Sequence, residues 1–233
     1  MIVYKFFSLI FYLISGPVFL LSSIILLFVS VFSLPLFYSL SKPFCRFILL
    51  SFGAIIKQSG TFPEKGTFII MMNHSSFLDI FLFPLIVNGR WSGVTAVENF
   101  KYPVLSLLLH KVNAIPIERD NITSAINSIS IAETVLKGGT HIGILPEGSR
   151  TTSGRMLPFK KGPFHMAINT QTPILPVVVK GGFKFKPKNR WYIKPGIIDI
   201  EVGEPIDVTE YSSKDVDSLL NKTHSIFNQL LNQ

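Results

Sequence analysis

The chain has 233 residues, enough for one well-formed hydrophobic core but not for two. Hydrophobic residues make up 48% of it and charged residues only 15%, a balance that favours a membrane-associated protein over a free cytosolic one. Lys and Arg outnumber Asp and Glu by 22 to 14, which suits anionic lipid, a phosphorylated substrate or nucleic acid. No basic stripe interleaved with aromatic residues and no nucleic-acid-binding motif occurs, so we expect no nucleic-acid partner.

The N-terminal region contains no charged residue from position 6 to position 41. This run exceeds the ~20 apolar residues that one membrane span needs and falls short of two spans. Pro17 and Pro35 interrupt it, so a kinked span, a re-entrant hairpin and two half-immersed helices all remain open. Lys and Arg flank both ends, and the first acidic residue is Glu64, which favours a hairpin that returns to the cytoplasmic face.

Beyond this region, short apolar runs alternate with amphipathic stretches, which indicates an α/β fold. We predict a mixed sheet flanked by helices, forming a single globular domain over residues 51–233 behind a membrane anchor at residues 1–50. Strands are expected at residues 67–72, 93–97, 113–117, 141–145 and 174–179, and a β-hairpin at 191–193 and 197–202. Helices are expected at residues 76–87, 104–110 and 122–136, after residue 162, and from residue 216 onward.

The most informative motif is Asn73-His74-Ser75-Ser76-Phe77-Leu78-Asp79, between a predicted strand and a predicted helix. Ligands of open α/β sheets bind at this carboxyl end of the strands. On one regular helix His74 and Asp79 would point ~140° apart, so they can meet only if the histidine lies in the loop. Ser76 is a suitable N-cap and would place Asp79 in the first turn.

Two interpretations of this spacing compete. In one, Asp79 only caps the helix and His74 is a surface residue. In the other, the carboxylate orients the imidazole, and His74 is a general base for a hydroxyl group. No G-x-S-x-G nucleophile motif occurs in the sequence, so the second interpretation places the nucleophile on the substrate.

Two further clusters end in arginine. The segment Pro146-Glu147-Gly148-Ser149-Arg150 follows a predicted strand and combines a glycine, which permits close backbone approach, with a guanidinium suited to phosphate. The segment Ile115-Pro116-Ile117-Glu118-Arg119 also ends a predicted strand. Each charged residue taken alone is more often a solvated surface group than a ligand.

Together the three clusters and the run Pro173-Ile174-Leu175-Pro176-Val177 resemble the four sequence blocks of glycerophospholipid acyltransferases, in the same order. The pattern is similar in particular to that of bacterial 1-acylglycerol-3-phosphate (lysophosphatidate) acyltransferases, over residues 68–206. This sequence departs from the family in having Leu145 and Ser149 in place of Phe and Thr, and Glu118 in place of Asp. It also has Asn113 where Gly is frequent, and Asn is the residue that best tolerates positive φ after Gly.

The resemblance implies that His74 is the general base, that Asp79 orients it, and that Arg119 and Arg150 hold the phosphate of the acceptor. Glu147, Gly148 and Ser149 are then expected to shape the substrate site, with Lys101 as a further binding residue. The co-substrate would be acyl-CoA or acyl carrier protein, and no cofactor or metal is expected. The expected product is phosphatidic acid, formed at the cytoplasmic face of a membrane, the inner membrane in a bacterium.

Two other functions remain open. The same chemistry could act on a lyso-aminolipid, another lysophospholipid or glycerol 3-phosphate. The chain could also be a non-catalytic membrane protein that binds anionic lipid, although this alternative gives no reason for a His–Asp pair at a strand end.

Overall fold

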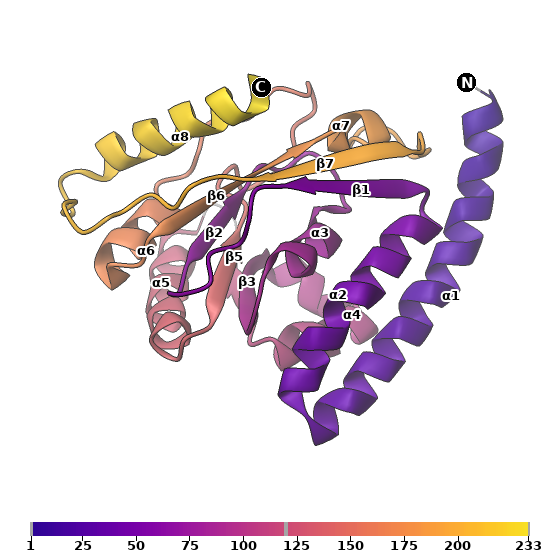
Figure 1. Cartoon of the computed structure of the whole chain (residues 1–233), viewed down its shortest axis with the longest axis horizontal. Helices are drawn as coiled ribbons and strands as arrows, with labels where there is room; N and C mark the ends of the chain where they lie inside the picture. The colour runs from indigo at the N-terminus through magenta and orange to yellow at the C-terminus, as the bar shows by residue number, and fades with distance from the viewer. Residues whose placement is uncertain (1, 119–120, 233) are drawn as a thin grey trace.

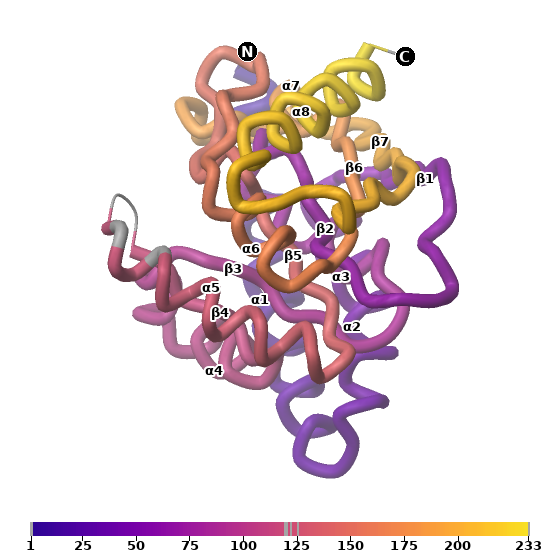
Figure 2. Tube along the Cα trace, turned by 90° about the vertical axis from the view of Figure 1, so that its left-hand side faces the viewer, coloured from indigo at the N-terminus to yellow at the C-terminus, as the bar shows by residue number. Residues whose placement is uncertain are grey.

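The computed structural model describes residues 2–118 and 121–232 as a three-layered α/β structure (Figure 1). A seven-stranded sheet separates two groups of helices. Helices α5 (Ile122–Lys137), α6 (Gly162–Thr170) and α8 (Val216–Asn232) cover one face and lie toward the viewer in Figure 2. Helices α1 (Ile2–Phe32), α2 (Leu34–Ser51) and α3 (Asp79–Ile86) lie on the other side, together with α4 (Pro103–Lys111).

The sheet is mixed, as the sequence predicts. Its strands run in the order β1-β7-β6-β2-β5-β3-β4, and only the pairing of β6 with β7 is antiparallel. The strands are β1 (Ala54–Ser59), β2 (Ile69–Met72), β3 (Trp91–Ala96), β4 (Ile115–Ile117), β5 (His141–Ile144), β6 (Ile174–Lys180) and β7 (Gly196–Val202). Because β2 to β6 are mutually parallel, their carboxyl ends meet at one edge, where the predicted motifs lie.

The central strands read as continuous apolar runs because both of their faces are covered. Every residue of β2 is buried, and so are all residues of β6 except the last. Alternate side chains enter different cores: Ile70 and Met72 pack with α2 and α3, whereas Ile69 and Met71 pack with α5, α6 and α8. This two-sided burial is what a parallel sheet between helical layers requires.

The first two helices form an antiparallel hairpin that turns at Ser33 (Figure 1). The buried residues of α1 are mostly serines spaced about seven apart, and Ser51 donates a hydrogen bond to Ser15 across the hairpin at 3.0 Å. Such small side chains let two helices approach closely. The outer face of α1 is apolar and exposed, with Phe28 at 66% and Phe32 at 74%.

Within the described residues, α1 is the single helix long and apolar enough to cross a membrane. An exposed apolar face of this length needs an apolar surrounding, so it indicates membrane association. The end of α2 belongs to the globular core, because Cys45, Ile48 and Leu49 pack with β6 and β7. The α1–α2 hairpin and the globular domain therefore share one hydrophobic core through α2.

Three details differ from the sequence predictions. The predicted hairpin at residues 191–202 is wrong, since only β7 is a strand, and it pairs with β6 and with β1. Strand β1 follows the anchor directly and was not expected. Helix α3 begins at Asp79 and not at Ser76. The expectation that Asn113 tolerates positive φ is confirmed by its φ of 51°.

Candidate active site

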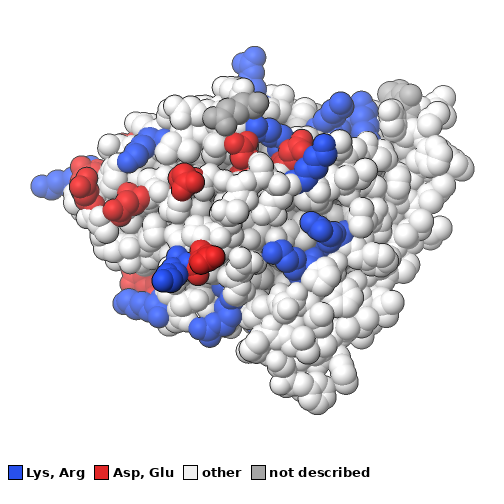
Figure 3. Space-filling view, in the orientation of Figure 1, with Lys and Arg blue, Asp and Glu red and all other residues white. Residues whose placement is uncertain are grey.

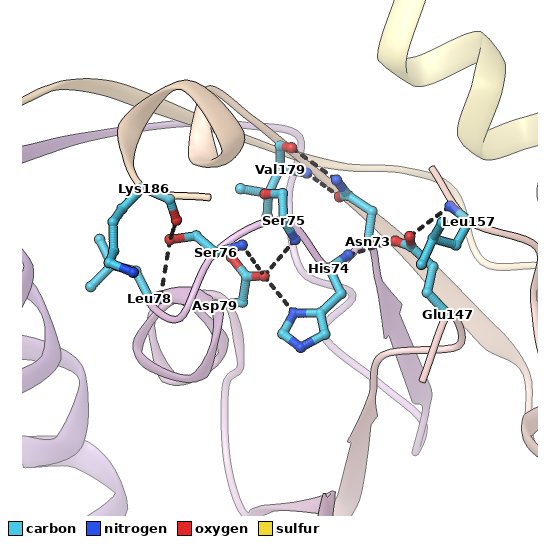
Figure 4. A network of polar contacts seen from close by, with 10 residues as sticks. All are labelled: Asn73, His74, Ser75, Ser76, Leu78, Asp79, Glu147, Leu157, Val179 and Lys186. Carbon is cyan, nitrogen blue, oxygen red and sulfur yellow. Dashed lines mark hydrogen bonds and ion pairs between the residues drawn. The ribbon is translucent and has the colours of Figure 1, made fainter. Parts of the chain in front are cut away.

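His74 and Asp79 meet at the carboxyl end of β2. The His74 Nδ1 atom lies 2.7 Å from Asp79 Oδ2, and the two side chains are 16% and 0% exposed. The histidine is thus reachable from outside, whereas the carboxylate is enclosed. Figure 4 shows the imidazole beside the start of α3, with the carboxylate between the ring and the loop backbone.

The loop between β2 and α3 wraps around the Asp79 carboxylate. Oδ2 accepts the backbone N–H groups of Ser75 at 2.8 Å and Ser76 at 3.0 Å, in addition to its contact with His74. The bond from the Ser76 N–H to the Asp79 carboxylate closes the turn that precedes α3. The Ser76 hydroxyl accepts from the Leu78 N–H at 3.4 Å, so residues 76–78 form a turn before the helix begins.

These bonds decide the tautomer of His74. A carboxylate only accepts hydrogen bonds, so the Nδ1 atom that contacts it must carry the proton. The other ring nitrogen, Nε2, is then left with a free lone pair. No hydroxyl or thiol among the described residues is hydrogen-bonded to the His74 ring. The pair can therefore accept a proton from a group that the enzyme does not itself supply.

Asn73 fixes the start of the β2–α3 loop to the neighbouring strand β6. Its side-chain amide donates to the Val179 carbonyl at 3.0 Å, and its oxygen accepts the Val179 N–H at 2.6 Å. The residue is buried, and both bonds bridge from β2 to β6 (Figure 4). The exchange replaces the ladder hydrogen bonds that end where β2 ends.

Glu147 holds the same loop from the opposite side. Its two carboxylate oxygens accept the backbone N–H of His74 at 2.6 Å and that of Leu157 at 2.7 Å. The residue is only 3% exposed, and burial raises its pKa, an effect that the two N–H groups partly offset. Each oxygen thus accepts one backbone N–H, and the carboxylate ties the β2–α3 loop to the segment after β5.

The rest of the predicted 146–150 cluster lies beside the backbone of His74. Gly148, in the turn that follows β5, has φ of +71°, a conformation that residues with a side chain adopt only with strain. Ser149 and Arg150 are half-buried next in the chain. The following N–H, that of Thr151, donates to the His74 carbonyl at 3.0 Å. The backbone of His74 is therefore hydrogen-bonded to this segment at both its N–H and its C=O.

A cavity of about 260 Å³ opens beside the histidine. The ends of β2 and β6 and the segment from Glu147 to Met156 line it, and Leu231 of α8 closes one side. Within the described residues, no group of three or more His, Cys, Asp or Glu side chains could hold a metal ion.

Of the predicted binding residues, Lys101 has no hydrogen bond or ion pair to this network among the described residues. Arg119 lies outside the described residues. Lys101 is exposed at the end of the short helix η1 (Val97–Lys101), which follows β3 at the same edge of the sheet.

Sequence reasoning missed Lys186, whose carbonyl accepts the Ser76 hydroxyl at 3.1 Å. It lies 112 positions after His74, and the one signal that could have found it is its place beyond the carboxyl end of β6.

A model of the acyltransferase family matches residues 54–180, more than half of the chain. The chain belongs to the acyltransferase family. This acyltransferase is 30% identical, over 183 residues, to a 1-acyl-sn-glycerol-3-phosphate acyltransferase of Cocos nucifera, a match that covers 78% of the chain and 59% of the relative. It is 28% identical over 173 residues to the human 1-acyl-sn-glycerol-3-phosphate acyltransferase alpha, covering 73% and 61%. The acyltransferase thus spans about three fifths of these relatives.

The acyltransferase also shares its fold with a solved structure. The crystal structure of the 1-acyl-sn-glycerophosphate acyltransferase PlsC of Thermotoga maritima matches 99% of this chain and 97% of that one, with a TM-score of 0.84. The two sequences are 23% identical. The match includes the N-terminal helices, so the hairpin is part of the shared fold.

Proposed function

We propose that this acyltransferase moves a fatty acyl group from a thioester donor to the free hydroxyl of 1-acylglycerol-3-phosphate, giving phosphatidic acid for phospholipid synthesis. The observation that carries the proposal is the contact of 2.7 Å between His74 and Asp79 beside an open cavity. A buried carboxylate and a partly exposed imidazole are the parts that a general base requires. Both curated relatives above carry the name of this activity.

In the proposed reaction, His74 Nε2 takes the proton of the acceptor hydroxyl as its oxygen attacks the thioester carbonyl. The imidazolium that forms is stabilised by Asp79 through Nδ1. Collapse of the tetrahedral intermediate breaks the carbon–sulfur bond, and the thiolate takes the proton from His74. The base is then restored and no covalent enzyme intermediate forms. The donor is acyl-CoA or acyl carrier protein.

We assign the acceptor's phosphate to Arg119 and Arg150, the arginines that end two of the four sequence blocks, and to Lys101. Arg150 supports this role by its place one residue from Thr151, which is bonded to the His74 backbone. Arg119 and Lys101 are assigned on sequence grounds. Gly148 and Ser149 lie in the bend between Glu147 and Arg150.

A direct test is acyl transfer measured by thiol release with a panel of lysolipids. Replacing His74 by Ala should lower turnover by about 10²- to 10⁴-fold, the usual worth of a positioned general base. The matched control is His110→Ala on the exposed surface of α4, which should keep its activity. Near-normal transfer by a folded His74→Ala protein would exclude the mechanism. Transfer to another lysolipid in preference to lysophosphatidate would be consistent with the proposed mechanism but would contradict the proposed substrate.

We further propose that the tip of the α1–α2 hairpin enters the cytoplasmic leaflet and that the hairpin returns to the same side. Two features support this arrangement. Both ends of the hairpin lie at the same end of the helix pair in Figure 1, and the face visible in Figure 3 is free of Lys, Arg, Asp and Glu over the lower part of the hairpin. The lipid acceptor would then reach the site without leaving the bilayer surface.

Truncating the anchor would not test this cleanly, because α2 contributes to the core of the domain. A sharper test places charge at the tip, with Phe28→Lys and Phe32→Lys. Both positions are largely exposed, so folding should be unaffected, whereas vesicle binding and activity on bilayer-embedded acceptor should fall. The control is Ile126→Lys on α5, where the side chain is 61% exposed but distant from the hairpin. Unchanged vesicle binding by the tip variants would disprove the insertion.

A further inference from the structure

Lys186, which no sequence motif identifies, belongs to a cationic pair beside the β2–α3 loop. Two contacts join it to that loop. Its carbonyl accepts the Ser76 hydroxyl at 3.1 Å, and its ammonium nitrogen lies 5.4 Å from the centre of the Phe77 ring. Phe77 lies within the motif between His74 and Asp79. The Lys186 charge is therefore held against the motif itself.

The second member of the pair is Arg150, which directly precedes Thr151, the residue whose N–H donates to the His74 carbonyl at 3.0 Å. Burial lowers the pKa of the half-buried Lys186, and the nearby Arg150 and Arg190 charges lower it further. Within the described residues, no carboxylate forms an ion pair with Lys186 or with Arg150. Among the described residues, the Lys186 ammonium makes a single hydrogen bond, a long one of 3.4 Å to the Pro187 carbonyl. Two neighbouring cations without an acidic partner repel each other, and this cost is recovered when an anion lies between them.

Arg190, by contrast, is used to build the segment that presents Lys186. Its guanidinium donates to the carbonyls of Lys184 at 2.7 Å, Phe185 at 2.6 Å and Tyr192 at 3.0 Å. Phe185 is 2% exposed and anchors the segment in the core. The position of Lys186 is thus determined by packing and by backbone hydrogen bonds, as expected for a binding residue and unlike a mobile surface lysine.

The far end of this segment is held by the membrane helix. Ser8 of α1 accepts the Ile193 N–H at 2.7 Å, and the Tyr12 hydroxyl donates to the Trp191 carbonyl at 2.6 Å. Lys and Arg side chains gather between α7 (Gly182–Phe185) and the upper end of α1 in Figure 3. The segment therefore bridges the anchor and the β2–α3 loop, where a phosphate at the membrane surface would enter.

We propose that Lys186 is a substrate-binding residue that, with Arg150, holds a phosphate group of a substrate next to His74. The inference rests on the proposed function, which supplies two phosphate-bearing substrates. One is the lysophosphatidate headgroup, and the other is the nucleotide part of acyl-CoA. Both present the same chemistry to a lysine and an arginine, so the experiment has to separate them.

The test uses Lys186→Met, which keeps the stem and removes the charge, and Lys186→Arg, which keeps the charge. Lys188→Met is the matched control, because Lys188 is exposed two positions away. Activity is measured with lysophosphatidate and with the monoacylglycerol that lacks the phosphate. Each is combined with acyl-CoA and with a phosphate-free acyl-N-acetylcysteamine thioester.

Lys186→Met should lower kcat/KM at least about tenfold for lysophosphatidate and leave monoacylglycerol transfer unchanged, since a charged hydrogen bond is lost only with the phosphate present. Lys186→Arg should restore most of the activity, and Lys188→Met should behave as wild type. A loss that disappears with the phosphate-free thioester instead would assign the pair to the donor. An equal loss with every substrate combination, or no loss at all, would overturn the proposal.

Binding without turnover separates this inference from the proposed function. Short-chain lysophosphatidate is titrated into the full-length protein in detergent without an acyl donor, and affinity is compared between wild type and Lys186→Met. Weaker binding by the variant supports the pair even if wild type transfers no acyl group to lysophosphatidate. Equal affinity for lysophosphatidate, together with an unchanged KM for acyl-CoA, would remove Lys186 from the site while leaving His74 as the base.

Discussion

Replacing Glu147 by Gln tests whether this buried carboxylate positions the β2–α3 loop that carries His74. In the wild type, its two oxygens accept the N–H groups of His74 and Leu157 at 2.6 and 2.7 Å. A glutamine has a single oxygen, so one of the two N–H groups would face an NH₂ group and lose its acceptor. A buried donor without a partner costs about 1–3 kcal/mol.

That cost should appear in both stability and rate. For a protein of this size, each kcal/mol lowers Tm by about 2–4 °C, which thermal unfolding in detergent can measure. If the glutamine oxygen stays with Leu157, the His74 backbone moves, and a comparable cost in the transition state lowers kcat by about tenfold to a hundredfold. The matched control is Glu204→Gln at an exposed position, which should change neither quantity.

The alternative role makes the opposite prediction. If Glu147 contacted the acceptor, the glutamine variant would raise the acceptor KM while Tm and kcat stayed close to wild type. That result would refute the positioning role. A variant that is both stable and fully active would show that the two N–H groups find other acceptors, and would refute it equally.

Three further outcomes are expected. Burial raises the pKa of Glu147 above its ordinary 4.5. The contribution of Glu147 to the free energy of unfolding is therefore fully present below pH 4.5 and is lost as the pH rises through the raised pKa. The difference in free energy of unfolding between wild type and Glu147→Gln should narrow as the pH rises over this interval, and a difference that widens would contradict the assignment. Asn73→Ala should lower the free energy of unfolding by about 2–4 kcal/mol, since it leaves the Val179 N–H and C=O unpaired, and a urea midpoint equal to that of wild type would argue against this bridge. Asp79→Asn should reduce kcat by about 10²- to 10⁴-fold with little effect on the acceptor KM, because an amide that donates to His74 Nδ1 moves the ring proton to Nε2. Steady-state kinetics measure both constants, and an effect confined to KM would contradict the proposed role of Asp79.

Local sequence patterns were sufficient to predict that His74 and Asp79 meet, and to predict most of the fold. His74 and Asp79 are five residues apart, and a strand that ends before them and a helix that begins after them leave little freedom in how they meet. The buried strands β2 and β6 were recognisable because their apolar runs lie between turn residues. The tolerance of Asn113 for positive φ likewise depends on the residue itself. Such features are predictable because they are decided within a few neighbouring residues.

Tertiary structure decided what distant segments do to one another. The sequence motif containing Glu147 suggested a substrate contact, and only the packing of the segment after β5 against His74 shows that both carboxylate oxygens are bound to backbone. The pairing of β7 with β1 joins residues about 140 positions apart, which no local periodicity encodes. Lys186 reaches the β2–α3 loop because β6 ends at the same edge of the sheet as β2. Side chains brought together in this way are specified by the order of the strands, which is a property of the whole chain.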